Sequence, residues 1–262
     1  MDLNLSGRTI IVTGASSGVG LATTRLLLAE GAQVAACARD GERLRSVLSD
    51  LPGASPHRLF TASCDVTDRD SAQRFTDAVL GEFGSIDGLV CNAGRSLMAT
   101  LDDTDDQAFR DEFELKIFGS WNMVRAARKA LAESGAGSVV NVNAILSRQP
   151  ESRLAATSAA RAALLNLTHT LAETLAEDGT RVNSVLLGLI DTGQWRRRFE
   201  SSGTTLSYDE WSAEIAANRG IALGRFGNAD EVAFHIVTLL SPRSSYTTAA
   251  TIDVGGGVAR YV

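Results

Sequence analysis

The fold is decided by the stretch TGASSGVG, residues 13–20. It follows the apolar run RTIIVTG, residues 8–14, and opens VGLATTRLLLAEG, residues 19–31, whose apolar residues recur with helical period. Gly14 allows a tight turn, while Gly18 and Gly20 let the backbone approach a phosphate and let a helix pack on a strand. A helix N-terminus adds amide donors and the positive end of its dipole. Because the glycines lie between a strand and a helix, the stretch predicts a pyrophosphate-binding loop.

The rest of the chain alternates apolar runs with segments of helical period. The further predicted strands are AQVAACA (32–38), HRLFTASCDV (57–66), SIDGLVCNAG (85–94), GSVVNVNA (137–144), RVNSVLLG (181–188) and TAATIDVGG (248–256). Helices are predicted at about 41–50, 68–83, 105–133, 154–178 and 228–240. Strands that are apolar without alternation, each followed by a helix, indicate a parallel sheet covered on both faces.

We therefore predict an α/β fold, a Rossmann-type doubly wound parallel sheet, in a single domain that spans residues 1–262. The one long irregular stretch, at about 191–220, is rich in Arg, Ser and Gly. A stretch of this kind is expected to form a lid-like substrate segment over a site.

Composition excludes several classes of partner. The net charge of -6 and a pI near 5.2 argue against a nucleic-acid or anionic-membrane surface. The N-terminal residues MDLNLSGR lack the positive charge and apolar core of a signal peptide, and no apolar run approaches the roughly 20 residues that span a bilayer. We expect a cytoplasmic protein. Cys37, Cys64 and Cys91 are not a close-spaced ligand pair, so we expect reduced core cysteines and no metal.

With its glycine loop the chain resembles the short-chain dehydrogenase/reductase family, and the resemblance covers nearly the whole length. CDV at 64–66 and NAG at 92–94 match family motifs, and GLIDT at 188–192 resembles the segment that contacts the nicotinamide, although Leu187 stands where proline is usual. GRFGNADEVA and SYTTAATIDVGGG resemble the C-terminal signatures. The resemblance implies a homo-oligomer, a dimer or tetramer, built by the two long helices and the C-terminal segment.

The resemblance also implies which residues bind a dinucleotide. They are Gly14, Ser16, Ser17, Gly18, Val19, Gly20, Arg39, Asp65, Val66, Asn92, Ala93, Gly94, Arg161 and Thr192. Family members that prefer NAD place an acid at the end of the second strand, where this chain has Ala38 followed by Arg39. A guanidinium suits a 2′-phosphate, so NADP(H) is favoured over NAD(H). A solvated surface arginine is the plainer interpretation of Arg39.

The catalytic tetrad that the family implies, asparagine, serine, tyrosine and lysine, is replaced at every position. The replacements are Lys116, Ala144, Thr157 and Arg161. If the alignment slips near 144, Ser147 is a stand-in for the serine. A threonine hydroxyl is a far weaker acid than a phenol, so Thr157 is a poor proton donor. Arg161 stays protonated and is able to bind ribose hydroxyls.

Two other groups are candidates for proton transfer or substrate binding. Burial and the nearby Arg161 would lower the pKa of Lys116, which makes its amine a candidate general acid, base or imine-forming group. The plainer alternative is that Lys116 extends out to solvent or pairs with an acid such as Glu112 on the same helix. In the lid, a solvated helix face is the stronger interpretation for at least two of the arginines 196–198. One of the three is free to clamp a carboxylate or phosphate of a small-molecule substrate, so the sequence leaves an anionic substrate open. Tyr208 is a further candidate phenol.

Three functions fit these residues. The first is an NADP(H)-dependent oxidoreductase that acts on a small carbonyl, alcohol or imine, with its proton from Lys116, water or the substrate. The second is a non-redox lyase, dehydratase or isomerase that uses Lys116 as base. The third is a dinucleotide-binding protein without turnover. Fold alone does not decide among them.

Overall fold

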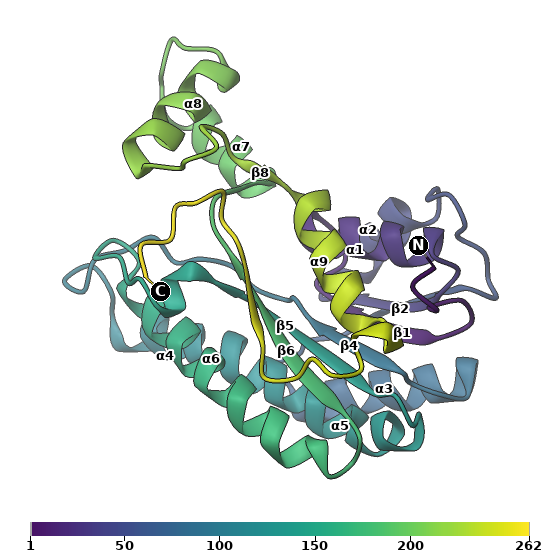
Figure 1. Ribbon diagram of the computed structural model, residues 1–262. Coiled ribbons are helices and arrows are strands. Elements are labelled where there is room, and N and C mark those ends of the chain that lie inside the picture. The colour runs from purple at the N-terminus through teal and green to yellow at the C-terminus, as the bar shows by residue number, and fades with distance from the viewer. Residues whose placement is uncertain (1, 262) are drawn as a thin grey trace.

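The computed structural model describes residues 2–261 (Figure 1). The strands are β1 (Thr9–Thr13), β2 (Gln33–Ala38), β3 (Leu59–Ser63), β4 (Gly88–Cys91), β5 (Ser138–Ala144), β6 (Arg181–Leu187), β7 (Ile190–Asp191), β8 (Gly227–Asn228) and β9 (Thr251–Val254). The helices are α1 (Gly18–Ala29), α2 (Gly41–Leu48), α3 (Arg69–Phe83), α4 (Asp106–Phe113), α5 (Gly119–Glu133), α6 (Ala155–Ala176), α7 (Gly193–Glu200), α8 (Tyr208–Arg219) and α9 (Ala229–Leu240). Short 3-10 turns are η2 (Ile145–Ser147) and η3 (Pro242–Ser244).

Seven strands form one parallel sheet in the order β3-β2-β1-β4-β5-β6-β9. The predicted Rossmann-type fold is therefore confirmed. The strand order reverses between β1 and β4, and ligands of open α/β sheets bind in the crevice at the carboxyl ends of the strands on either side of such a point. The fold thus puts the glycine loop after β1 and the NAG segment after β4 at the same edge.

Helices cover both faces of the sheet. Figure 1 shows α1 and α9 on one face and α3, α5 and α6 on the other. Successive side chains of a strand point to opposite faces, and β1 divides accordingly: Ile10 and Val12 belong to the apolar cluster under α1 and α9, whereas Ile11 belongs to the cluster under α3 and α5. All five residues of β1 are buried, which explains its unbroken apolar sequence.

The predicted helix at 105–133 is continuous but is not α-helical throughout. The chain winds as a π-helix, η1 (Glu114–Phe118), between α4 and α5. Such wide turns are rare in proteins, and many of those that occur lie at functional sites. Lys116 lies in the middle of this turn.

A buried polar network ties α5 and α6 to the sheet. On β5, the amide of Asn141 accepts a hydrogen bond from Ser120 of α5 at 2.8 Å and donates one to Thr168 of α6 at 2.9 Å. The Ser184 hydroxyl of β6 donates to the Asn141 carbonyl at 3.2 Å. These bonds satisfy polar groups that would otherwise be costly to bury, and they fix the long helices against the central strands.

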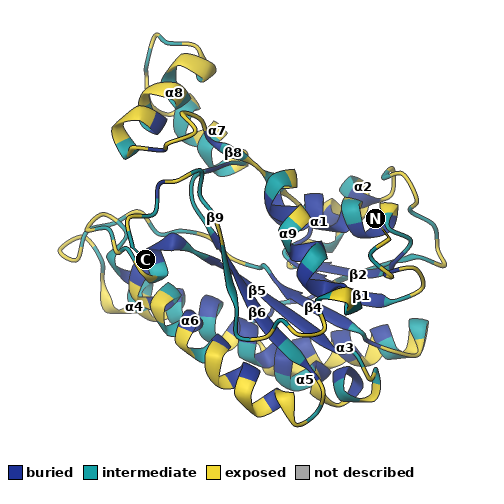
Figure 2. Cartoon of the chain, in the orientation of Figure 1, coloured by how far each residue is buried: buried dark blue, intermediate teal, exposed yellow. Residues whose placement is uncertain are grey.

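The predicted irregular lid is in fact largely helical. Helices α7 and α8 stand beyond the carboxyl ends of the strands, and Figure 2 colours most of their residues intermediate or exposed. The capping box of Ser207 and Glu210 begins α8, and Gly220, with φ of +68°, ends it. Trp195 and Trp211 pack with the other aromatic rings of this segment, so side-chain packing that composition does not reveal stabilises the two helices.

The three cysteines are free and buried, in agreement with the expectation of reduced core residues. Between residues 2 and 261, none of the helices combines the length and the apolar character that crossing a bilayer requires.

The glycine at position 20 permits a close approach that no other residue allows. A Cβ there would lie 2.4 Å from the Gly14 carbonyl oxygen and 2.5 Å from the Asn92 side-chain nitrogen. We expect Gly20→Ala to lower the free energy of unfolding by about 1–3 kcal/mol, measured by urea denaturation.

The control is Gly81→Ala, in the exposed part of α3, where an added Cβ meets nothing within 4 Å. This change should raise the free energy of unfolding by about 0.5–1 kcal/mol, because alanine loses less backbone entropy. Equal effects of the two variants would contradict the close-approach argument.

Candidate functional site

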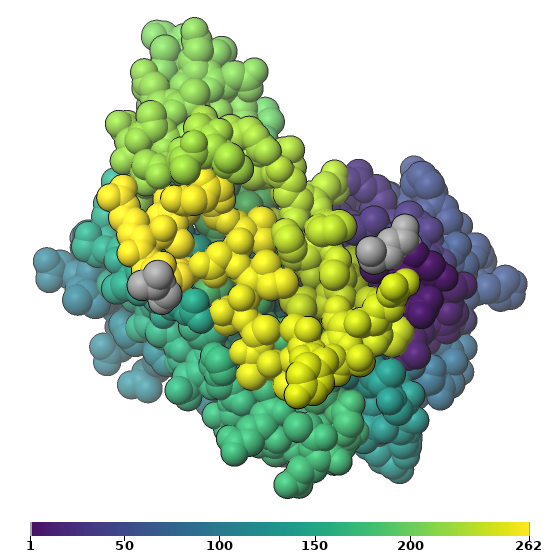
Figure 3. Space-filling view, in the orientation of Figure 1, coloured from purple at the N-terminus to yellow at the C-terminus, as the bar shows by residue number. Residues whose placement is uncertain are grey.

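A large open cavity lies at the carboxyl ends of the strands, beneath the lid. It encloses about 910 Å³. Its wall is formed by the glycine loop, the ends of β2, β3, β4 and β5, and helix α7. Figure 3 shows the helical lid as a separate lobe above the body of the molecule. The cavity therefore occupies the crevice that the strand order predicts.

The glycine loop is held by the segment that follows β4. The Asn92 side chain donates to the carbonyl oxygens of Thr13 at 2.9 Å and Gly14 at 3.2 Å. In return the Thr13 hydroxyl accepts the backbone N–H groups of Asn92 and Ala93 at 2.9 and 3.0 Å. Gly14 has φ of +65°, and a Cβ there would lie 2.9 Å from the Ala93 Cα. The NAG motif thus holds the glycine loop in shape.

Thirteen of the fourteen predicted nucleotide-contacting residues lie on the cavity wall. The exception is Gly20, which lies behind the loop against Gly14. Arg39 lines the cavity and is exposed. Asp40, the carboxylate that follows it, caps α2 by accepting the Arg43 N–H at 2.9 Å. Sequence reasoning missed Arg43, which also lines the cavity; its four-residue spacing from Arg39 was the available signal.

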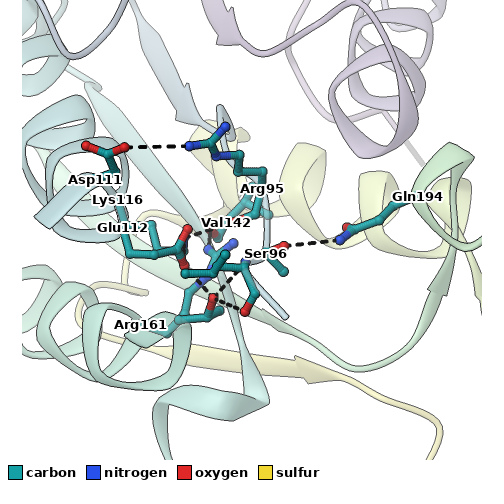
Figure 4. Close-up of polar contacts among 10 residues, drawn as sticks. Arg95, Ser96, Asp111, Glu112, Lys116, Val142, Arg161 and Gln194 are labelled. Atoms are coloured by element: carbon teal, nitrogen blue, oxygen red, sulfur yellow. Dashed lines mark hydrogen bonds and ion pairs between the residues drawn. The ribbon is translucent and has the colours of Figure 1, made fainter. Parts of the chain in front are cut away.

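Lys116 is buried and paired. Its side chain is 1% exposed, and its amine donates to the Glu112 carboxylate at 2.6 Å and to the Arg95 carbonyl oxygen at 2.9 Å (Figure 4). The hydroxyl of Thr157 donates to the same Glu112 carboxylate and accepts the N–H of Leu97 at 3.1 Å. The structural pair with Glu112 is confirmed, and the sequence did not reveal that Thr157 joins it.

This buried cluster of Glu112, Lys116 and Thr157 is not on the wall of the large cavity. Burial, followed by the positive charge of Arg161, lowers the pKa of Lys116 to about 8, while Glu112 opposes the shift. The pKa is suited to proton transfer, but the amine is directed at Glu112 and Arg95. Lys116 instead lines a small pocket of about 10 Å³ that shares Ala93, Val142 and Arg161 with the wall of the large cavity, and its catalytic role stays a prediction.

Arg161 is the replaced tetrad residue that brings charge to the cavity wall. Its guanidinium donates to the Val142 carbonyl oxygen at 2.7 Å, and its Nε is buried without a hydrogen-bond partner in residues 2–261. Burial lowers its pKa to about 10, so it remains protonated at neutral pH. Ala144 also lines the cavity and offers a methyl group. The Ser147 hydroxyl donates to the Ala144 carbonyl oxygen at 2.8 Å away from the wall, so it does not replace the serine.

The lid contacts the body across the cavity. The Gln194 amide donates to the Ser96 carbonyl oxygen at 3.5 Å (Figure 4). Tyr208 is directed elsewhere: its hydroxyl donates to Asp191 at 2.5 Å, beneath the Arg196 guanidinium, 3.6 Å from the ring centre. Burial and then Asp191 raise the pKa of Tyr208, and the residue is not on the cavity wall. A substitute phenol is therefore not supplied by Tyr208 in this arrangement.

The match to known proteins agrees with this geometry. Residues 14–259 match the family model described as enoyl-(acyl carrier protein) reductase. The 3-oxoacyl-(acyl-carrier-protein) reductase of Thermotoga maritima is 32% identical over 256 residues, with 98% of this chain and 99% of the relative covered. The chain belongs to the short-chain dehydrogenase/reductase family.

Two further relatives bear on the site. The cis-4-hydroxycyclohexanecarboxylate dehydrogenase of Sinomonas cyclohexanicum is 36% identical over 253 residues, covering 95% of this chain and 96% of the relative. A short-chain oxidoreductase of Pseudomonas aeruginosa PAO1, described as containing an atypical catalytic center, is 45% identical, with 98% and 99% of the two chains covered. Its apo and NADPH-bound structures have TM-scores of 0.94 and 0.92.

Glu112 keeps the Lys116 charge paired inside the protein. We expect Glu112→Gln to lower the free energy of unfolding by about 3–5 kcal/mol, because it leaves a buried ammonium without its anion. The double variant Glu112→Leu with Lys116→Met removes both charges and should recover most of that loss. Urea denaturation measures both effects.

Lys129 and Glu133 offer a matched control, since they have the same four-residue spacing on an exposed surface, 3.8 Å apart. Glu133→Gln should change the free energy of unfolding by less than about 0.5 kcal/mol. If Glu112→Gln were as mild as Glu133→Gln, the buried pair would not have the structural role argued for it.

Proposed function

We propose that this chain is an NADP(H)-dependent oxidoreductase that acts on a small carbonyl or alcohol substrate, or an imine, through a nonstandard active site. One observation carries the proposal: the residues expected to bind the nucleotide, apart from Gly20, line the cavity, together with Arg43, while Thr157, at the position of the usual proton donor, lies outside it. The NADPH-bound structure of the Pseudomonas relative supports the choice of cofactor. The secondary alcohol in the name of the Sinomonas relative's substrate supports the choice of substrate class.

The residues present fit a phosphorylated dinucleotide. The backbone of the loop is open to a pyrophosphate at Gly18, which has no side chain and lies at the N-terminus of α1, while Gly14 lets the loop pack closely on Ala93. Two guanidiniums at the end of β2 and the start of α2 suit a 2′-phosphate. When bound, the nicotinamide would exchange hydride with the substrate carbon.

Arg161 has the role of binding and electrostatic stabilisation in this proposal. A fixed guanidinium on the cavity wall would hold ribose hydroxyls and favour negative charge that develops on a substrate oxygen. Because Thr157 and Lys116 are directed at Glu112, the proton is supplied by water that enters the open cavity. The buried cluster then has a structural role and does not itself react, and the Val142 carbonyl oxygen holds Arg161 at the cavity wall.

We expect a homo-oligomer, a dimer or a tetramer, which light scattering of the purified chain would reveal.

The cofactor preference depends on Arg39. We expect Arg39→Gln to weaken NADPH binding by roughly 10-fold to 100-fold, since a charge-assisted contact to the 2′-phosphate is lost, and to leave NADH binding within about 2-fold. Isothermal titration calorimetry measures both affinities. Arg45→Gln, an exposed arginine of α2 that is not on the cavity wall, is the control. Equal weakening of NADPH and NADH binding would refute a role in reading the phosphate.

Turnover tests the reaction class. We expect loss of NADPH absorbance with at least one member of a panel of ketones, aldehydes and imines, a kcat lowered about 100-fold by Arg161→Met, and turnover retained in the Glu112→Leu/Lys116→Met variant. NADPH binding without turnover would instead indicate a dinucleotide-binding protein. Substrate conversion without an absorbance change would indicate a lyase, dehydratase or isomerase.

A further inference from the structure

The cavity wall is richer in positive charge than the chain as a whole. It carries seven arginines and five acidic residues, whereas the chain has a net charge of -6. Arg39 and Arg43 lie at the adenosine end and Arg161 lies on the floor. A second group, at the lid side, comprises Arg197, Arg198 and Arg219. The proposed nucleotide site gives no reason for this second group.

Arg198 is the half-buried member of the group that has no anionic partner, whereas Arg197, which is also unpaired within residues 2–261, is exposed to solvent. Arg219 forms an ion pair with Glu151. Arg198 has neither an ion pair nor a side-chain hydrogen bond with any part of the chain from residue 2 to 261. It is nevertheless half-buried, which is unfavourable for a cation without an anionic partner.

The position of Arg198 is fixed by aromatic packing. Its guanidinium lies 4.5 Å from the centre of the Trp195 ring, one turn earlier on α7. That indole packs in turn against Phe226 at 4.8 Å and Trp211 at 6.1 Å. A cation held over an aromatic face keeps its edge available for hydrogen bonding, so the arrangement is preorganised.

The charged side chains that act on Arg198 are positive. Burial lowers the pKa of Arg198, and the positive charges of Arg219 and Arg153 lower it further. Arg219 brings Glu151 with it, and Glu151 also lines the cavity. Like charges placed together at a cavity wall repel one another, and a bound anion would relieve that repulsion.

The lid-side group also lies at a suitable place for a substrate. Glu151 and Arg153 belong to the loop between β5 and α6, which begins just after Ala144 on the cavity wall. Arg39 and Arg43, in contrast, follow β2, on the other side of the sheet's switch point. A molecule held at the lid side would therefore extend toward Ala144 and Arg161 without overlapping the adenosine end.

We propose that Arg198, with Arg219 and the indole of Trp195, binds an oxyanion at the end of the substrate remote from its reacting carbon. The oxyanion is a carboxylate or a phosphate, so the substrate is an anionic carbonyl or hydroxy compound. This inference rests on the proposed function for the reaction, but the anion site itself does not require turnover.

Ligand binding tests the site directly. The probes are benzoate, phenyl phosphate and the neutral methyl benzoate, titrated by calorimetry into the chain with and without NADPH. We expect both anions to bind the wild-type chain at least roughly tenfold more tightly than the ester, and Arg198→Gln to reduce anion affinity about tenfold while leaving the ester unchanged. Whichever anion binds more tightly identifies the oxyanion as carboxylate or phosphate.

Arg196→Gln is the matched control. Arg196 lies on the same helix but pairs with Asp191 at 2.7 Å and is not on the cavity wall, so its loss removes a cation and a lid contact without touching the proposed site. Anion affinity should stay within about 2-fold of wild type. Equal binding of anions and ester to the wild-type chain, or equal losses in the two variants, would overturn the proposal.

A turnover comparison separates this inference from the proposed function. With levulinate and methyl levulinate as carbonyl probes, Arg198→Gln should raise KM for the acid about tenfold and leave KM for the ester unchanged. Anion binding that depends on Arg198 in a chain that neither binds NADPH nor reduces carbonyls would contradict the proposed function alone. NADPH turnover with no preference for the acid would contradict the anion site alone.

Discussion

The arrangement of the site depends on the hydrogen bonds that the buried carboxylate of Glu112 accepts. It accepts hydrogen bonds from Lys116 in the π-helix and from Thr157 in α6, and the same two residues bond the backbone at Arg95 and Leu97. Three segments distant in sequence thus meet at one group. Removing two charges from water costs several kcal/mol per ion, and only a well-bonded pair offsets that cost. The cluster is therefore specific in geometry even where its net contribution to stability is small.

The two halves of the site differ in how much they depend on side chains. Phosphates are recognised largely by backbone N–H groups and the end of a helix dipole, so the requirement falls on conformation, as at Gly14 and Gly20. Proton donation instead requires an ionisable side chain at one place, and Thr157 does not provide it. The replaced tetrad positions lie on β5, η1 and α6, which are separate from the glycine loop, so they can change without any change of residue in the loop.

The sequence predicted what is encoded locally. The strands, the parallel sheet and the glycine loop follow from short patterns, and each is present. The sequence did not predict the helices of the lid. Contacts among Trp195, Trp211 and Phe226 stabilise α7 and α8, and the spacing of these residues in the sequence does not indicate that they are in contact. Lys116 shows the same limit. Glu112 lies one helical turn before Lys116, so their ion pair could be anticipated. The hydrogen bond from Thr157 to Glu112, forty-five residues apart in the sequence, could not.

The ion pair between Glu112 and Lys116 also determines which positive charge acts on the cavity. Arg161 is near enough to Lys116 to lower the pKa of the lysine, and two uncompensated cations beside one cavity would repel each other strongly. Glu112 neutralises Lys116 within the protein interior, so the pair contributes little net charge. Arg161, beside this cluster, has no ion pair within residues 2–261 and lies on the cavity wall. A residue that never touches a ligand can in this way set the electrostatic field of a site, by deciding which of two neighbouring positive charges remains uncancelled.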